Sequence, residues 1–450
     1  GGHWNFSRQV YENGDILAEI LTAEGNLTTY LDHIDSTGAY TSRIIDPAGA
    51  ETLYTLTADG LTANKSLPCG MNLIFKYGVD SQYKYEFVKE MREKAASGLE
   101  RIILRERTYQ DTNLDNIPDI VTEKVTLNGR ASTFVTNTIQ SKKTLTSPVG
   151  RSINASYDPN NLLTTRLTIP GLYGTNFGYD SKGRLRSVNT NNRQATFGYD
   201  TQGNLSSITD PENRTTTYSY DAVGRMKGIL RPDNSLVSFA YDKNGNMTVL
   251  TNPSTVNHGF GYNKVNLNSS YQTPLSGSYS YLYNKDRQLK QVNFPSGKQI
   301  SLLYDHDRLS NIQTPEGNIN LSYLCGSKVG SITKGAEGIS YGYDGYLVTS
   351  ETLGGTLNQT LNYSYNNDFY LKSLTYAGGT VNYTYDNDGL LTGSGPFTIT
   401  RNAGNGLPES VTGGALNLTR SFNGYGELES QNFVVNGLGI TSWGLTRDKA

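Results

Sequence analysis

Oxygen-bearing side chains stand at alternate positions in one short segment, residues 111–119. The five candidate ligands are Asp111, Asn113, Asp115, Ile117 (through its backbone carbonyl) and Asp119. Hard oxygen ligands at this spacing suit Ca²⁺, because a tight loop turns alternate residues toward one point. Asn116 stands where such loops usually have glycine, and Thr122 stands where they usually have a bidentate glutamate. Two interpretations follow: a calcium-binding loop, or a solvated turn between two strands.

Side chains suited to catalysis are few and scattered. Among the histidines, only His306 has an acidic residue on each side, Asp305 and Asp307, and these residues occupy the turn of an ordinary repeat. No phosphate-binding loop or paired-histidine zinc motif occurs. Gly424 and Gly426 begin a pattern like a dinucleotide fingerprint, but the third glycine is missing. We therefore expect neither catalytic nor cofactor-binding residues, and no enzyme.

The chain has two cysteines, Cys69 and Cys325, which match no metal-binding or redox spacing. We interpret them as small core or strand residues, since unpaired cysteine behaves as a small hydrophobe. A disulfide between them stays open as the alternative in a secreted protein.

A tyrosine recurs every 19 to 22 residues through most of the chain. Eight of these twelve tyrosines are followed by Asp and three by Asn, a bias that indicates a tandem repeat. We call them the marker tyrosines: Tyr157, Tyr179, Tyr199, Tyr220, Tyr241, Tyr262, Tyr283, Tyr304, Tyr323, Tyr343, Tyr365 and Tyr385. A period of this length predicts one small structural unit per copy.

Each copy combines a strand signal with a turn signal. In most copies a second ring stands two residues before the marker tyrosine, so both rings face the same side of a strand. An Asp after the marker and a Gly three residues further on predict a hairpin turn, because Asp bonds to nearby backbone and Gly accepts a positive φ. The clearest structural markers are Tyr179, Asp180, Gly183, Tyr199, Asp200, Gly203, Tyr220, Asp221, Gly224, Tyr241, Asp242, Gly245, Tyr385, Asp386 and Gly389.

The strand after the turn carries apolar residues three apart, as in Leu205 and Ile208. This spacing does not fit a flat strand, whose side chains alternate, and it predicts a bulge or a strong twist. Pro211 and similarly placed prolines close several copies, because proline cannot continue a strand. The unit is therefore strand, tight turn, strand and loose turn. A single hairpin is marginally stable, whereas stacked hairpins bury each other's aromatic face.

The stretch from Tyr199 to Pro211, Tyr-Asp-x-x-Gly-x-Leu-x-x-Ile-x-Asp-Pro, resembles the YD repeat, also called the RHS repeat. Such repeats occur in bacterial RHS and polymorphic toxin proteins, in shell-forming subunits of insecticidal toxin complexes, and in teneurins. The resemblance covers roughly residues 145–430. It implies an all-β fold in which tandem hairpins form one long spiralling antiparallel sheet, part of a hollow shell or barrel. In the toxin members that shell encloses a C-terminal effector.

Three other repeat folds have comparable repeat signals and fit the residues less well. A parallel β-helix also uses about 20 residues per coil but lacks a hairpin turn in every coil. Choline- and glucan-binding repeats rely on tryptophan, and here Trp4 and Trp443 lie outside the strong repeats. Propeller blades need about 40 residues and would require two alternating repeat types, which the sequence lacks.

The strength of the repeat varies along the chain. The predicted segments are a divergent repeat-like β region (1–80), an irregular β-hairpin region (81–144), the repeat array (145–430) and a trailing strand (431–450). In the second segment a long charged hairpin around Ser97-Gly98 is the preferred interpretation, and a short helix at residues 91–96 is the alternative. The chain starts at Gly1 without an initiator methionine, so we expect a piece of a longer protein.

Charge and hydropathy bear on two classes of partner. Lys and Arg total 39, Asp and Glu total 41, and no basic block occurs, so nucleic acid is not expected. The sequence has no run of about 18 apolar residues, so no membrane span is expected.

The resemblance and the missing catalytic residues together predict a non-enzymatic scaffold. It would form part of a shell that encapsulates or presents a C-terminal effector or toxin polypeptide of a large, secreted or surface-exposed bacterial protein. The expected partners are that polypeptide and neighbouring shell segments of the same parent. The alternative is a carbohydrate-binding or cell-adhesion module, as in teneurins, in which exposed tyrosines stack on glycans. Calcium is the one cofactor that the sequence suggests.

Overall fold

The computed structural model describes residues 2–275 and 277–449, which form two compact units. Unit 1 comprises Gly1–Val79, Glu86–Ile102 and Val237–Gly379, and unit 2 comprises Asp80–Tyr85, Ile103–Leu236 and Thr380–Ala450. The described residues contain 41 strands and one short 3₁₀ helix, η1 (Pro68–Gly70). The all-β prediction is confirmed.

Each strand is assigned here to the unit that holds most of it. The strands of unit 1 are β1 (Asn5–Val10), β2 (Ile16–Leu21), β3 (Leu27–Ile34), β4 (Tyr40–Ile45), β5 (Glu51–Leu56), β6 (Thr62–Ser66), β7 (Asn72–Val79), β8 (Glu86–Lys94), β21 (Leu236–Tyr241), β22 (Met247–Thr251), β23 (Asn257–Tyr262), β24 (Asn268–Gln272), β25 (Ser278–Tyr283), β26 (Leu289–Asn293), β27 (Gln299–Asp305), β28 (Arg308–Thr314), β29 (Gly317–Leu324), β30 (Lys328–Lys334), β31 (Glu337–Asp344), β32 (Leu347–Gly354), β33 (Gln359–Tyr365) and β34 (Leu371–Tyr376). Those of unit 2 are β9 (Glu100–Gln110), β10 (Ile120–Leu127), β11 (Arg130–Asn137), β12 (Lys142–Thr146), β13 (Ser152–Tyr157), β14 (Thr164–Thr168), β15 (Thr175–Tyr179), β16 (Leu185–Thr190), β17 (Arg193–Tyr199), β18 (Leu205–Thr209), β19 (Thr215–Tyr220), β20 (Met226–Leu230), β35 (Gly379–Tyr385), β36 (Leu391–Ser394), β37 (Phe397–Arg401), β38 (Pro408–Gly413), β39 (Leu416–Phe422), β40 (Leu428–Val435) and β41 (Leu438–Gly444).

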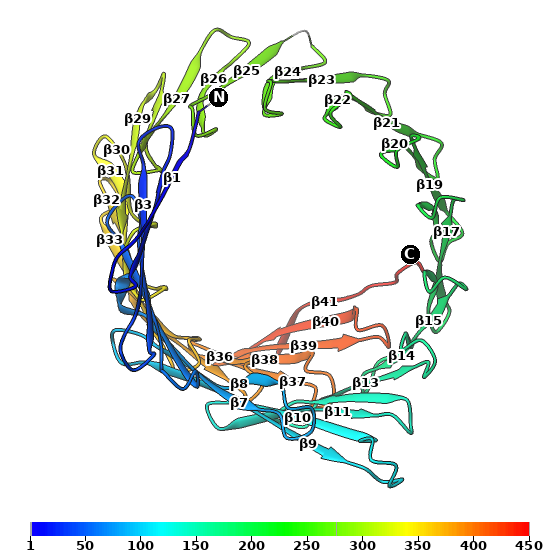
Figure 1. Cartoon of the computed structure of the whole chain (residues 1–450). Coiled ribbons are helices and arrows are strands. Elements are labelled where there is room, and N and C mark those ends of the chain that lie inside the picture. The colour runs from blue at the N-terminus through cyan, green and yellow to red at the C-terminus, as the bar shows by residue number, and fades with distance from the viewer. Residues whose placement is uncertain (1, 276, 450) are drawn as a thin grey trace. The chain divides into compact units, whose positions relative to one another are not determined.

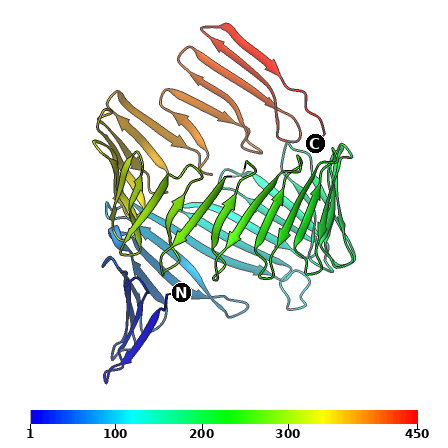
Figure 2. The ribbon, with the colours of Figure 1, turned by 90° about the horizontal axis from the view of Figure 1, so that it is seen from above.

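Consecutive strands pair antiparallel within each unit, as tandem hairpins require (Figures 1 and 2). In the hairpin of β17 and β18, Phe197 lies opposite Ile208 and Tyr199 lies opposite Leu205. A two-residue step on one strand therefore matches a three-residue step on the other. The register shift falls between Gly198 and Tyr199 and recurs at other marker tyrosines, which confirms the predicted bulge.

The N-terminal part of the chain uses the same hairpin unit. β8 and β9 are joined by a turn in which the Ala95 N–H donates to the Leu99 carbonyl at 2.9 Å, and Gly98 has a φ of 93°. The predicted hairpin around Ser97-Gly98 is confirmed. The helix alternative for residues 91–96 is wrong, because these residues lie in β8 and its turn. The division into four segments stays a prediction.

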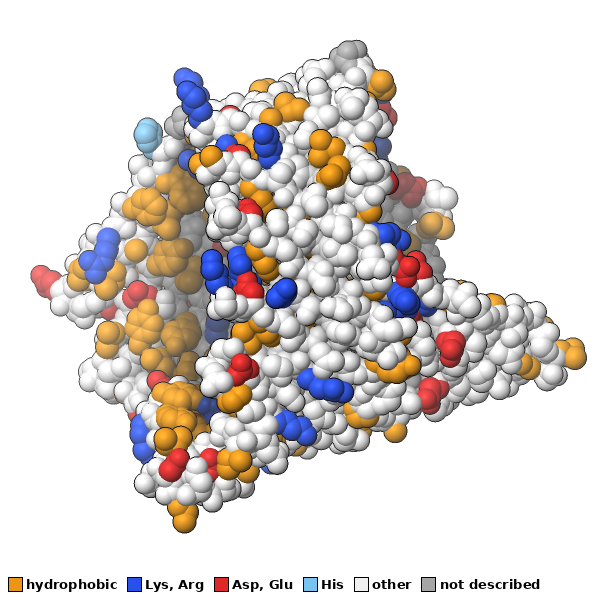
Figure 3. Space-filling model, turned by 90° about the vertical axis from the view of Figure 1, so that its right-hand side faces the viewer, with side chains coloured by type: hydrophobic (Ala, Val, Ile, Leu, Met, Phe, Trp, Pro, Cys, Tyr) orange, Lys and Arg blue, Asp and Glu red, His pale blue; other side chains and the backbone are white. Residues whose placement is uncertain are grey.

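The two faces of each hairpin carry different side chains. Phe197 and Ile208 pair on one face, whereas Gly198 lies opposite Ser207 on the other. Ser364 and Ser373 make a hydroxyl–hydroxyl hydrogen bond of 2.6 Å across β33 and β34. One face is thus aromatic and aliphatic, and the other is small and polar. On the side shown in Figure 3, the backbone and side chains that are neither hydrophobic nor charged (white) cover most of the surface, and charged side chains of both signs are scattered over it.

Few side chains are fully enclosed. The buried hydrophobic residues within the described ranges are Ala63, Met71, Ala95, Tyr157 and Leu347. The accessible surface is 25988 Å², whereas a compact monomer of 49.4 kDa is expected to expose roughly 17,000 Å². The chain therefore exposes more surface than a compact domain of its mass, and apolar-face side chains such as Phe197 and Ile208 are only half-buried. Among the described residues, no helix is long and apolar enough to cross a membrane.

Candidate functional site

The marker tyrosines tie each hairpin to the one before it. The Tyr199 hydroxyl donates to the Leu185 carbonyl at 2.8 Å, and the Tyr220 hydroxyl donates to the Leu205 carbonyl at 2.8 Å. Each acceptor lies at the start of the second strand of the preceding hairpin. The equivalent bond is made by Tyr179, Tyr262, Tyr283, Tyr304, Tyr323, Tyr343 and Tyr365. Tyr241 and Tyr385 likewise end their strands, β21 and β35.

The Asp that follows a marker holds its own turn. Asp200 accepts the Asn204 backbone N–H at 2.8 Å and the Asn204 side-chain amide at 3.0 Å. The bond from the Asn204 side chain, with those from the turn backbone, lowers the pKa of Asp200, so the carboxylate is charged. Gly203 has a φ of 97°, a conformation that favours glycine. The equivalent pairs are Asp180 with Gly183, Asp221 with Gly224, Asp242 with Gly245, and Asp386 with Gly389.

Removing one marker hydroxyl should destabilise unit 2 by about 1 kcal/mol, the usual net contribution of one hydrogen bond. Tyr220→Phe keeps the ring and deletes only the bond to Leu205. Urea unfolding should show a lower midpoint. Tyr218→Phe, on the same strand, is the control, because the Tyr218 hydroxyl has no hydrogen-bond partner among the described residues. Equal shifts in the two variants would show that the bond to Leu205 contributes nothing specific.

Within each unit, some turns also contact turns that are far away in the sequence, and we call these contacts the seam. In unit 1, Asp286 accepts hydrogen bonds from the Thr22 hydroxyl at 2.5 Å and from the Ala23 N–H at 2.9 Å. Asp344 accepts hydrogen bonds from the Ser97 N–H, at 3.0 Å, and from the Ser97 hydroxyl. The sequence separations of Asp286 from Thr22 and of Asp344 from Ser97 are 264 and 247. The seam therefore joins segments that strand pairing does not.

A disulfide between Cys69 and Cys325 belongs to the same seam. Its Cα atoms lie 5.2 Å apart, at a sequence separation of 256. The interpretation of both cysteines as unpaired core or strand residues is wrong. Cys69 lies in η1 and Cys325 in the turn between β29 and β30. The sequence held one signal that this turn is unusual: Tyr323 is the one marker tyrosine followed by Leu324 instead of Asp or Asn.

In unit 2 the seam contains an ion-pair cluster around Arg151. The Arg151 Nη1 atom lies 2.8 Å from Asp386 Oδ2 and 2.6 Å from Asp388 Oδ2. Asp388 also accepts the Ser147 hydroxyl at 2.7 Å and the Val149 N–H at 3.1 Å. The Arg151 side chain is 15% exposed. Burial acts to raise the pKa of Asp386, but hydrogen bonds from its own turn and from Arg151 outweigh it and hold the pKa below its usual value.

A second contact in the seam of unit 2 centres on Arg193. Arg193 and Glu427 form a bidentate pair, with Nη1–Oε1 and Nη2–Oε2 distances of 2.7 and 3.1 Å. The guanidinium also lies 3.8 Å from the centroid of the Tyr425 ring, which packs edge-on against Tyr173. The hydrogen bond from Arg193, followed by that from Asn423, lowers the pKa of Glu427 to about 2.

The stability that Glu427 contributes to unit 2 should be lost only in strong acid. Its pKa falls from 4.5 to about 2 on folding, so its contribution to stability is present above pH 4.5 and is lost as the pH falls toward 2. Urea unfolding should show a stability difference between the unchanged chain and Glu427→Gln that is constant from roughly pH 7 to 5 and disappears near pH 2. Glu429→Gln, an exposed position on β40, is the control. A difference that disappears already at pH 5 would contradict this assignment.

The predicted calcium ligands lie in the loop between β9 and β10. Asp111 accepts the N–H groups of Leu114 and Asn116 at 2.7 and 2.8 Å. Asp119 is 5% exposed, and it accepts the N–H and the hydroxyl of Thr112 at 2.8 and 2.7 Å. Both carboxylates therefore accept hydrogen bonds from within the loop itself.

The other three candidate ligands make similar local bonds. The Asn113 amide donates to the Asp115 carboxylate at 3.1 Å, and Asp115 accepts the Ile117 N–H at 2.8 Å. Within residues 2–275 and 277–449, no three His, Cys, Asp or Glu side chains are grouped so that they could hold a metal ion. Sequence reasoning missed these turn-internal bonds, although Asp and Asn at alternate positions are also typical of such turns.

Calcium binding at this loop stays a prediction with its own test. Isothermal titration with millimolar Ca²⁺ should show binding to the unchanged chain and none to Asp111→Asn, because the amide keeps the size but loses the charge. A flat titration of the unchanged chain would contradict the hypothesis and would leave a turn that serves only its own hydrogen bonds.

His306 and its neighbours make contacts within their own turn and with the adjacent turn. The His306 Nδ1 atom lies 2.8 Å from Asp305 Oδ1, and these side chains are 53% and 63% exposed. Asp307 accepts the Gln288 side-chain amide at 2.6 Å. Burial, followed by the charge of Asp286, raises the pKa of Asp307. This arrangement resembles a solvated turn, as expected from the sequence.

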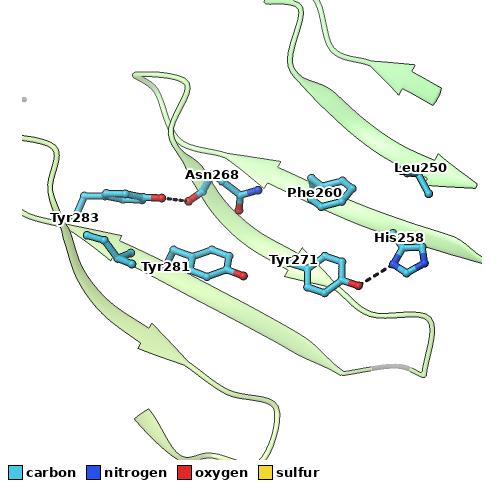
Figure 4. A pocket seen from close by; sticks show the side chains of 8 residues that line it. Leu250, His258, Phe260, Asn268, Tyr271, Tyr281 and Tyr283 are labelled. Carbon is cyan, nitrogen blue, oxygen red and sulfur yellow. Dashed lines mark hydrogen bonds between the residues drawn. The ribbon is translucent and has the colours of Figure 1, made fainter. Parts of the chain in front are cut away.

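An apolar pocket of about 510 Å³ lies on the aromatic face of unit 1 (Figure 4). Its lining residues are Leu250, His258, Phe260, Asn268, Tyr271, Tyr281, Tyr283 and Leu289. The Tyr271 hydroxyl lies 2.7 Å from His258 Nδ1, and the two rings stack with centroids 5.9 Å apart. No Asp, Glu, Lys or Arg is among the lining residues, so the pocket suits an uncharged guest.

Comparison with known proteins places the repeat in a family. The family model described as Teneurin YD-shell matches residues 79–450. Similar solved structures include the Photorhabdus luminescens Tc holotoxin pore, at 13% identity and a TM-score of 0.44, covering 96% of this chain and 29% of that one. The TcdB2-TccC3-TEV structure has 12% identity and a TM-score of 0.39, with 96% and 31% covered. The chain thus spans under a third of each of those chains. No curated protein matches the sequence.

Proposed function

This chain belongs to the teneurin YD-shell family, and on that premise we propose that it is a non-enzymatic β-scaffold. It forms part of a shell wall that encapsulates or presents a C-terminal effector or toxin polypeptide. The parent is a large secreted or surface-exposed bacterial protein. The partners are the enclosed polypeptide and neighbouring wall segments of the same parent.

One observation carries the proposal: the hairpins are tied together along the chain and across the seam, while the side chains of their apolar face are only half-buried. The marker tyrosines bond hairpin to hairpin, and the seam bonds distant turns. The accessible surface of 25988 Å² is about 1.5 times that expected of a compact monomer of this mass. Apolar side chains that are only half-buried along one face favour contact with another polypeptide. The local carboxylates are occupied in turns, which supports a structural role.

Protease protection tests this function. The parent protein, expressed with its C-terminal polypeptide, should protect that polypeptide from trypsin while the wall is folded. Arg151→Met, which weakens the seam of unit 2, should increase the cleavage rate of the polypeptide. Cleavage at the same rate as the free polypeptide, with the wall intact, would contradict encapsulation.

A second candidate is a carbohydrate-binding or adhesion module, and the aromatic pocket of unit 1 favours it. The stacked rings of Tyr271 and His258 offer a flat surface on which a sugar ring packs. A glycan array should then give hits that Tyr271→Ala removes. An array without hits would discard this candidate.

A further inference from the structure

The disulfide belongs to the seam of unit 1, in which two aspartates also make side-chain contacts. Asp286 and Asp344 form hydrogen bonds that are part of the seam of unit 1. The hairpin of β29 and β30 lies between them in the sequence. There Leu324 replaces the usual Asp, and the bond between Cys69 and Cys325 makes the contact instead. A seam of hydrogen bonds therefore contains one covalent bond.

The two cysteine residues differ in their exposure to solvent. Cys325 is exposed, whereas Cys69 is half-buried. A pocket of about 280 Å³ borders Cys325, and Pro68, Lys328 and Asp46 contribute to its lining. Asp46 uses its carboxylate to accept backbone N–H groups of its own turn at 2.8 and 2.9 Å. The pocket therefore leaves room for a small thiol beside Cys325, and its charged lining residues, Asp46 and Lys328, have opposite signs.

Both cysteines lie in the left-handed region of the backbone, with φ values of 69° and 48°. A residue with a β-carbon is disfavoured in this region and stays there only where its surroundings hold it. Gly70 and Gly326, which follow them, have φ values of 80° and 85°. The disulfide holds these two tight turns against each other. We therefore expect the seam to open at these turns once the bond is broken.

We propose that the Cys69–Cys325 disulfide is a thiol-sensitive lock on the seam of unit 1, and that Cys325 Sγ is the atom attacked. The thiolate of glutathione, or of a similar small thiol, bonds to Cys325 Sγ. The S–S bond breaks, and Cys69 leaves as a thiolate that takes up a proton. A second thiol attacks the outer sulfur of the mixed disulfide and releases Cys325 as a thiol, together with the oxidised reagent dimer. The protein gains two electrons and two protons, which the two reagent thiols supply.

Reduction loosens the seam locally and leaves the hairpins paired. Strand pairing and the tyrosine bonds do not involve the disulfide, and the contacts of Asp286 and Asp344 remain. Gly345 donates its N–H to the Cys69 carbonyl at 3.2 Å, so this amide reports directly on the lock. The inference goes beyond the proposed function, because it concerns how unit 1 is fastened, whatever the sheet encloses.

The test treats the native chain with millimolar reduced glutathione at neutral pH and follows it by peptide mass spectrometry and hydrogen exchange. A transient glutathione adduct is expected on Cys325 and not on Cys69. Amides in residues 67–71 and 324–328 should then exchange at least ~10-fold faster, while those of β17 in unit 2 stay unchanged. The variant Cys69→Ser/Cys325→Ser should exchange fast from the start and should not respond to glutathione.

Three results would overturn the lock: a disulfide that glutathione reduces only in urea, an adduct on Cys69, or reduction without faster exchange. If the double variant does not fold, the native chain with and without glutathione still decides. The protease test of encapsulation is done in oxidising buffer, so the lock and the proposed function can fail independently.

Discussion

Replacing Arg151 with methionine is expected to lower the free energy of unfolding of unit 2 by about 2 kcal/mol. The substitution keeps most of the side-chain length and removes the charge that lies 2.8 and 2.6 Å from Asp386 and Asp388. These carboxylates are 16% and 10% exposed, so without their partner they repel each other where water solvates them poorly. The effect is smaller than for a fully enclosed pair, because some water reaches the cluster. Urea unfolding measures the loss.

Arg214→Met is the matched control for this prediction. Arg214 lies 2.7 Å from Asp210 within a single turn, and its side chain is 50% exposed. An exposed pair of this kind contributes little, so the unfolding midpoint should not move measurably. Equal losses in Arg151→Met and Arg214→Met would mean that the seam contributes no more than an ordinary surface pair.

Truncating Met71 to alanine is expected to cost unit 1 about 3 kcal/mol. Met71 is 1% exposed and is one of the two largest fully buried side chains in the described ranges. It packs tightly against Gly345, where an added β-carbon would lie 2.6 Å from the Met71 Cε atom. The cost is large because few side chains are enclosed, and a cavity left by Met71 has little around it that can fill the space.

Two further methionine variants separate burial from side-chain chemistry. Met71→Leu nearly keeps the volume and should cost less than about 1.5 kcal/mol. Met247 lies at a half-buried position of β22. Met247→Ala should cost about 1 kcal/mol, because this side chain has less buried apolar surface to lose than Met71. Urea unfolding of the three variants gives the order. A loss in Met71→Ala no larger than that in Met247→Ala would contradict the packing described for unit 1.

The hairpin, its turn and its bulge could be predicted from the sequence because each depends on a few neighbouring residues. Asp200 and Gly203 are sufficient to predict the tight turn, and the spacing from Leu205 to Ile208 requires the bulge. The hydroxyl bond of Tyr199 was not predicted, although its acceptor lies only one hairpin away. A preference for tyrosine over phenylalanine at the marker position was the available signal.

The seam could not be predicted, because its partners are far apart in the sequence. Thr22 and Asp286 are separated by 264 positions, and no local pattern states which turns meet. Which turns meet depends on the twist of the sheet, summed over many strands. A weak signal exists in the third residue of the turn, which is Asp in Asp286 and Asp388 but Lys182 in an exposed turn. The disulfide could not be predicted for the same reason, since two cysteines in a sequence do not indicate how far apart they lie in the fold.

Small-angle X-ray scattering of the chain in solution tests most directly whether these hairpins form the wall of a hollow shell. A curved wall around solvent should give a pair-distance distribution whose maximum is shifted toward long distances. A distribution with a short-distance maximum and a long linear tail, as a solid extended rod gives, would contradict it.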